Sequence, residues 1–158
     1  MRLSTRARYG VAAMCELAGR EPGAAVPLRD IAASQVLSES YLEQLFLALR
    51  RGGLVRSVRG AQGGYTLARD AAEITVGDVL RVLEGPIAPV PCVAPGVGRK
   101  DRCTRHSYQG CPTRPVWDRL AGCMARVLDG ITLADLAGDE EPVFPDQSCA
   151  VCRITPDH

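Results

Sequence analysis

Three cysteines carry the clearest chemistry in this chain of 158 residues. Cys92, Cys103 and Cys111 lie in a segment rich in glycine and proline, with ten residues between the first two and seven between the last two. Such a segment cannot form a packed core of its own. Three thiolates converging from it would suit an iron-sulfur cluster or a zinc ion, and binding would offset the entropy lost when the segment is ordered.

The cellular compartment determines whether these thiols are expected to be reduced or oxidised. The chain contains seven cysteines, begins without the apolar stretch of a signal peptide, and has no apolar run near the roughly 18 residues of a membrane span. We therefore expect a cytoplasmic protein with no membrane partner. Its thiols should be reduced, and the cysteines of the segment should act as ligands or redox sensors rather than form disulfides.

Charge is distributed unevenly although the formal net charge is only +1. Residues 1–69 hold ten arginines against five acidic residues, whereas residues 131–158 hold six acidic residues and one arginine. This asymmetry fits a protein that meets the phosphates of a nucleic acid with one end only.

The basic half has the pattern of a helix-turn-helix. Apolar residues recur at helical spacing over residues 5–19 and again over residues 27–33, where Pro27 suits the first turn of a helix. Residues 35–37 are predicted to form the turn between this second helix and a third one.

The third helix is predicted to open at Ser38, which suits an N-cap, although Ser40 with Glu43 also fits a capping box. Its apolar stripe consists of Leu42, Leu45, Phe46 and Leu49. After two glycines, residues 54–59 alternate as a strand, residues 60–64 turn, and residues 65–67 return as a second strand. This hairpin is predicted to be a wing.

Five residues are the predicted contacts to DNA. Ser40, Glu43 and Gln44 would project from the start of the third helix toward base edges, where glutamate can accept from cytosine and glutamine can pair with adenine. Arg59 and Gln62 would contact DNA from the wing, whose adjacent glycines let the backbone approach a groove. A structural interpretation remains open, in which Glu43 caps its helix and Gln44 is solvated.

Two more helices are predicted beyond the wing. Residues 75–83 fit a helix capped by Thr75 with Asp78 three residues later. Residues 115–128 fit a longer helix with an apolar stripe formed by Val116, Leu120, Cys123 and Val127. A single winged helix has little core left to cover this stripe, so we infer that the helix pairs with its mate in a homodimer that reads a palindromic operator. Packing against the first helix is the alternative.

The predicted fold class is mainly α with a small β wing: a winged helix-turn-helix followed by a long C-terminal dimerisation helix. The expected divisions are a DNA-binding domain at 1–84, a cysteine-rich segment at 85–112, the dimerisation helix with a short following helix at 113–137, and an acidic, flexible tail at 138–158.

The chain resembles the iron-sulfur winged-helix regulators of the IscR and NsrR type. The matching stretches cover about residues 1–137 and include the first ten residues, residues 40–45, 53–55, 57–60 and 63–65, the three cysteines and residues 131–136. The resemblance implies a dimeric transcription regulator, acting as a repressor, with a [2Fe-2S] cluster on the three cysteines. It also implies that Ser40, Glu43, Gln44 and Arg59 matter for reading DNA.

The chain departs from that family at the fourth cluster ligand. Its cysteines are more widely spaced than is usual there, and Arg114 stands where some members carry a histidine. Arginine stays protonated and has no lone pair to offer a metal. Other members use a carboxylate near the start of the partner chain, a region where Arg8 stands here. His106 is the favoured candidate because imidazole replaces thiolate in known clusters; Asp101, a tail cysteine or a residue of the other subunit stay open.

A second cysteine pair, Cys149 and Cys152, lies in the acidic tail as a CxxC motif without a partner pair. It is interpreted as incidental thiols, a redox pair or a cover for the cluster. No arrangement of nucleophile and base is apparent, so the chain is not expected to be an enzyme.

The predicted function is transcription regulation in which a cluster sets operator affinity and senses iron-sulfur status, nitric oxide or redox stress. Because Cys111 precedes the long helix, gain or loss of the cluster would reset the start of that helix and shift the DNA-reading helices. The alternative is a cluster-free winged-helix regulator that uses zinc, a thiol switch or a partner enzyme of cysteine metabolism.

Overall fold

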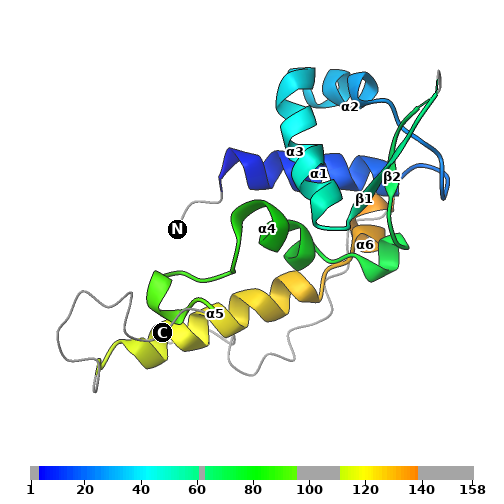
Figure 1. The fold of residues 1–158 in the computed structure, drawn as a ribbon. Helices are drawn as coiled ribbons and strands as arrows, with labels where there is room; N and C mark the ends of the chain where they lie inside the picture. Colours follow the sequence, from blue (N-terminus) through cyan, green and yellow to red (C-terminus); the bar gives the residue numbers. More distant parts are fainter. Residues whose placement is uncertain (1–3, 61–62, 96–110, 139–158) are drawn as a thin grey trace, which may run out of the picture.

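The computed structural model describes residues 4–60, 63–95 and 111–138. Its elements follow the order α1 (Thr5–Ala18), α2 (Leu28–Gln35), α3 (Glu39–Arg51), β1 (Val55–Val58), β2 (Gly64–Leu67), η1 (Ala71–Glu73), α4 (Val76–Glu84), η2 (Pro91–Val93), α5 (Arg114–Asp129) and α6 (Leu133–Ala137). Figure 1 shows α1 running through the middle of the molecule, with α2, α3 and the hairpin on one side and α4 and α5 on the other. The predicted winged-helix class is confirmed.

The core lies where α1, α2, α3 and the hairpin meet. Phe46, Met14, Ile31, Leu42 and Leu49 are fully enclosed there. Two aromatic contacts join the elements: Tyr9 and Tyr41 meet edge to face at 6.2 Å, and Phe46 and Tyr65 at 4.7 Å between ring centroids. These contacts fix α3 and the wing on one body.

The hairpin pairs β1 with β2 in antiparallel register, with Val55 opposite Leu67 and Val58 opposite Gly64. A bridge that the sequence pattern did not predict adds Val26 to the outer side of β2, since Val26 and Tyr65 exchange two backbone hydrogen bonds of 2.9 Å. A Cβ atom at Gly64 would lie 2.7 Å from Pro27 N and closer still to the Val26 carbonyl. Gly64 is therefore required by this close backbone approach within the fold.

The second helix differs from its prediction. It begins at Leu28 with Pro27 as its N-cap, and it continues through Gln35 rather than ending at residue 33. Val36 ends it in the left-handed conformation, with φ of 54° and ψ of 46°. The chain offers no glycine or proline at this point, so the usual local signal for a helix end is missing.

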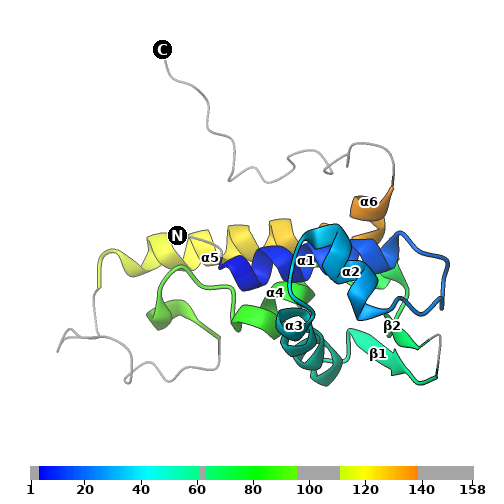
Figure 2. The same ribbon diagram turned by 90° about the horizontal axis from the view of Figure 1, so that it is seen from above.

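The long helix α5 extends from the body and touches it along one side through α4 (Figure 2). None of its residues is fully buried, and the exposed fractions of Val116, Leu120 and Val127 are 58%, 41% and 53%. No helix in the described part of the chain is long and apolar enough to cross a membrane.

Candidate nucleic-acid interface and cysteine segment

The candidate interface begins with the way that α3 starts. The Ser38 hydroxyl accepts a hydrogen bond of 3.3 Å from the amide of Tyr41, which makes Ser38 the N-cap. A capping box at Ser40 and Glu43 was one interpretation of the sequence, and it is wrong because the helix begins two residues earlier than that box requires. Within the part of the chain that the structure describes, the Glu43 side chain makes no hydrogen bond or ion pair.

Four exposed residues line one face of α3. Ser40, Glu43, Gln44 and Leu47 follow the spacing i, i+3, i+4 and i+7, while Leu42, Leu45, Phe46 and Leu49 point into the core. The burial of the opposite stripe therefore holds these four side chains toward solvent. Leu47 is not among the predicted DNA contacts, although its spacing of seven residues from Ser40 could have identified it.

The wing adds positive charge beside this face. Arg59 is exposed and directly follows β1, and Gly60 turns the chain with φ of 123°. The amide of Gly63 donates to the carbonyl of Gly60 at 2.9 Å, which closes the turn. The start of α3 and the far end of the hairpin point to the same side in Figure 1. Gln62, the other wing residue that the sequence singled out, lies outside the described residues.

The cysteine segment is at another place on the molecule. Cys92 lies in η2, which contacts α5, and Cys111 lies three residues before α5 begins. Both thiols are half-buried, and the Sγ atom of Cys111 is 3.3 Å from the hydroxyl of Thr113. Figure 1 shows η2 and the start of α5 at the lower left, away from the start of α3 and the wing. Within the described chain, Cys92 and Cys111 therefore lie away from the predicted DNA contacts of α3 (Figure 1).

Two soft thiol donors near one end of α5 can supply part of the ligand set of an iron-sulfur or zinc site. The first residue of α5 follows Thr113, whose side chain makes no capping hydrogen bond. The amides of Arg114 and Val116 donate to the carbonyls of Cys111 and Thr113, each at 3.2 Å, and Pro115 between them has no amide hydrogen. Cys103, His106, Asp101, Cys149 and Cys152 lie outside the described residues. Within the described ranges, no three His, Cys, Asp or Glu residues form a group that could hold a metal ion.

Arg114 occupies the first position of α5 and pairs with Asp118 at 3.2 Å along the same helix. Cys15 and Cys123 lie elsewhere: Cys15 packs against the core of the winged helix, and burial raises the pKa of its thiol. Cys123 lies on α5, where it accepts from Arg126 at 3.3 Å.

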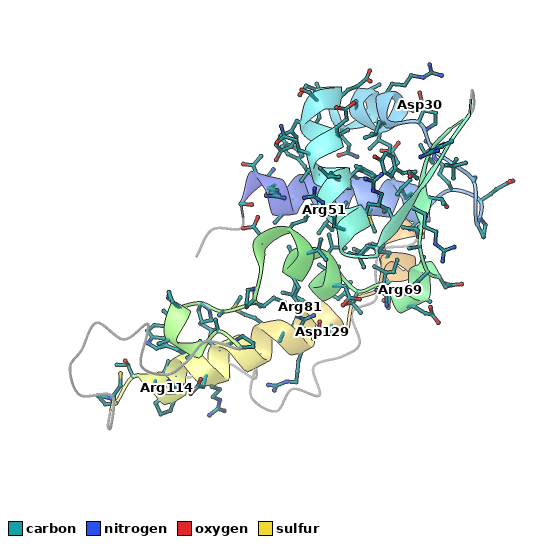
Figure 3. The ribbon with its side chains drawn as sticks, in the orientation of Figure 1. Asp30, Arg51, Arg69, Arg81, Arg114 and Asp129 are labelled. Atoms are coloured by element: carbon teal, nitrogen blue, oxygen red, sulfur yellow. The ribbon has the colours of Figure 1, made fainter. Side chains whose placement is uncertain are left out.

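A pair of charged residues joins α4 to α5. The guanidinium of Arg81 donates to both carboxylate oxygens of Asp129, at 2.6 and 2.7 Å, and Figure 3 shows the two side chains facing each other between the helices. The hydrogen bond from Arg81 lowers the pKa of Asp129 below its usual range and raises the pKa of Arg81. No local sequence pattern indicates this contact between residues 48 positions apart.

The end of α5 is held to the winged helix by backbone contacts as well. The amide of Val76 donates to Ile131, and that of Leu133 to Ile74, each at 2.9 Å. Thr132 caps α6 in a capping box with Asp135, as Thr75 does for α4 with Asp78. The predicted capping of α4 is confirmed.

The fold and the exposed face of α3 next to a wing define a winged-helix DNA-binding protein. The chain belongs to the Rrf2 family, described as iron-dependent transcriptional regulators, whose model matches residues 3–139. The predicted family resemblance is therefore confirmed.

The relatives include two kinds of regulator. The chain is 43% identical over 137 residues to the HTH-type transcriptional regulator CymR of Bacillus subtilis, covering 87% of this chain and 90% of the relative. It is 41% identical over 142 residues to the HTH-type transcriptional regulator IscR of Cronobacter sakazakii, covering 89% and 83%. These names describe transcription regulators, which supports the expectation that the chain is not an enzyme.

Solved structures show the same two kinds. The structure of B. subtilis CymR, titled as the global cysteine regulator, has a TM-score of 0.70 and 42% identity, and covers 87% of this chain and 96% of the other. The structure of T. potens IscR has a TM-score of 0.66 and 43% identity, and covers 94% and 95%. Overall similarity therefore does not separate a CymR-like from an IscR-like regulator. The distinction depends on what the cysteines of this chain bind.

Proposed function

We propose that this chain is a homodimeric regulator that binds a palindromic operator and represses transcription, with operator affinity set by a [2Fe-2S] cluster on Cys92, Cys103 and Cys111. The observation that carries the DNA-binding part is the exposed face of α3. Ser40, Glu43 and Gln44 lie there on a capped helix beside the wing residue Arg59. The N-terminal turn of such a helix is the part that enters the major groove.

The cysteines support the cluster. Cys92 and Cys111 are brought to one end of α5, and Cys103 lies between them in the sequence with His106, Asp101, the tail and the partner subunit as sources of a fourth ligand. A bound cluster would supply a redox- and nitric oxide-sensitive group at that end. In this proposal the chain transmits the change in cluster occupancy. The segment η2 and the start of α5 move together when the cysteine ligands bind or release the cluster.

Dimerisation is supported by the apolar side chains that α5 leaves exposed. Val116, Leu120 and Val127 remain exposed on a helix that contacts α4 and η2 within the described chain. Two copies of α5 could cover these residues against each other. Such a pair would place two α3 helices for two half-sites.

The similarity to CymR favours a second candidate function, in which the chain binds DNA without a cluster and responds through zinc, thiol oxidation or a protein partner. The pair Cys149 and Cys152 is the candidate redox pair in that case. One experiment separates the two functions.

The experiment is anaerobic purification followed by visible absorption and assays of iron, sulfide and zinc per chain. The cluster predicts absorption between about 320 and 600 nm with matching iron and sulfide. Replacing Cys92, Cys103 or Cys111 by alanine should abolish that absorption and change operator affinity, whereas Cys123→Ala should keep both. A colourless protein that binds DNA and cannot be reconstituted would contradict the cluster and leave the second candidate.

A further inference from the structure

The turn between α2 and α3 contains the one non-glycine residue with positive φ in the described part of the chain. Val36 adopts φ of 54° and ψ of 46°, and 90% of its surface is exposed. A left-handed backbone is unfavourable for an L-residue because the Cβ atom crowds the following carbonyl oxygen, and a β-branched side chain there is a genuine outlier. Val36 is therefore both strained and unburied.

The backbone conformation has a structural reason. The amide of Leu37 donates to the carbonyl of Ala32 at 2.9 Å, and Val36 donates to the carbonyl of Ala33 at 3.4 Å. This pattern ends α2 in the way that helices commonly end, with one left-handed residue, and Leu37 then packs against the core. The turn thus requires a left-handed residue at position 36, a role that glycine fills without strain.

Packing inside the fold does not explain why a valine side chain stands at position 36. An isopropyl group that is 90% exposed gains little from burial, so packing does not offset the strain. Backbone strain that packing does not explain is found most often at functional sites. Val36 also lies two residues before Ser38, the N-cap of the helix that carries Ser40, Glu43 and Gln44.

We propose that Val36 is a specificity-determining residue that contacts the 5-methyl group of a thymine in the major groove. Apolar side chains read this methyl group, which distinguishes thymine from cytosine at the groove surface. The left-handed turn places the valine two residues before the N-cap of α3, the helix that carries the polar candidate contacts. This inference rests on the proposed binding of operator DNA by α3.

The test begins with in vitro selection of operators from a random-sequence duplex library with the wild-type chain. Each thymine of the selected duplex is then replaced by deoxyuridine, which lacks the methyl group but keeps the hydrogen-bonding groups. Wild-type affinity, measured by fluorescence anisotropy, should fall about fourfold at one position of each half-site, as expected for the loss of one buried methyl contact.

Variants at position 36 separate contact from strain. Val36→Ala keeps the left-handed strain but loses both methyl groups, and Val36→Gly loses both the strain and the side chain. Each should bind thymine and deoxyuridine duplexes equally, whereas Val36→Ile should keep the preference for thymine. Thermal melting should show all three variants folded, with Val36→Gly within about 3 °C of wild type, because the relieved strain and the added entropy of the unfolded chain are similar in size.

Failure of the Val36 contact can be distinguished from failure of the proposed operator binding. If no duplex is enriched, the proposed operator binding fails and this inference fails with it. If a duplex is enriched but no thymine is sensitive to deoxyuridine, or if Val36→Gly keeps the sensitivity, only the role of Val36 is overturned.

Discussion

At the scale of single residues, the candidate interface combines two kinds of contact. Glu43 is exposed on α3 with no partner in the described chain, and a carboxylate there can accept from a cytosine amino group. Arg59 is exposed at the end of β1, where its charge suits a phosphate or a narrow minor groove. The two residues should therefore respond differently to substitution.

We expect Glu43→Ala to relax selectivity at one base pair of the operator, with a change of about 1–3 kcal/mol between the preferred pair and the others. Arg59→Ala should weaken binding to all duplexes and lower the salt dependence of the affinity by about one counterion if Arg59 contacts a phosphate. Anisotropy titrations against operator and scrambled duplexes at several salt concentrations measure both effects. Equal losses on all duplexes for Glu43→Ala would contradict a base-reading role.

At the scale of elements, the wing depends on its contact with the segment before α2. Gly64 lies against the Val26 carbonyl and Pro27 N, where the backbone atoms leave no room for a Cβ. The same bridge ties β2 to the end of the loop that follows α1.

Gly64→Ala should therefore destabilise the fold by about 1–3 kcal/mol, as expected for overpacking against atoms that cannot move aside. Chemical denaturation measures the change in the free energy of unfolding. Gly19→Ala is the matched control, since its Cβ would lie 3.7 Å from the nearest heavy atom and its φ is −76°. An equal effect of both substitutions would show that the bridge to Val26 does not constrain the wing.

The ion pair between α4 and α5 is the second link between elements. Asp129 has a pKa below its usual range in the folded chain, so its contribution to stability is fully present above the unfolded pKa of about 3.9 and is lost as the pH falls through the folded pKa. Both side chains are about two-fifths exposed, so solvent screening limits the contribution.

Asp129→Asn should lower the free energy of unfolding by at most about 1 kcal/mol at pH 7, and the difference from wild type should shrink as the pH falls below about 4. Thermal melting across pH 3–7 measures it. Asp118→Asn is the control, because Asp118 pairs with Arg114 within α5 and joins no two elements. A difference that stays constant down to pH 3 would contradict the assignment to Asp129 ionisation.

At the scale of the whole molecule, the DNA-facing end and the cysteine segment lie apart, and α5 connects the segment to the body (Figure 1). The apolar residues of α5 that remain exposed are the candidate contacts of a second chain. If dimerisation uses them, the same helix carries the partner contact and the end where the cysteines lie.

We expect Leu120→Glu to give a monomer in size-exclusion chromatography with light scattering, because a carboxylate cannot be buried against an apolar helix without a large cost. Operator affinity should fall with it, since a monomer contacts one half-site. Asp118→Asn, at a polar position of α5 rather than in its apolar stripe, should remain a dimer. A dimeric Leu120→Glu variant would place the partner contact elsewhere.

Local patterns in the sequence were sufficient to predict several elements. The apolar period of α3, the caps at Ser38 and Thr75, and the glycines after α3 all act within a few residues, so periodicity and capping rules were enough to find them. The family resemblance rested on part of α3 together with the first ten residues, the wing, the three cysteines and residues 131–136.

Contacts between residues far apart in the chain became visible in the folded structure alone. The structure showed that Arg81 pairs with Asp129, that Gly64 faces Val26, and that Val36 ends α2 in a strained, exposed conformation. The first two follow from how α4, α5 and the wing pack once the core has formed, whereas the end of α2 at Val36 has no glycine to signal it in the sequence. Packing also decided that α5 leaves its apolar side chains uncovered within one chain.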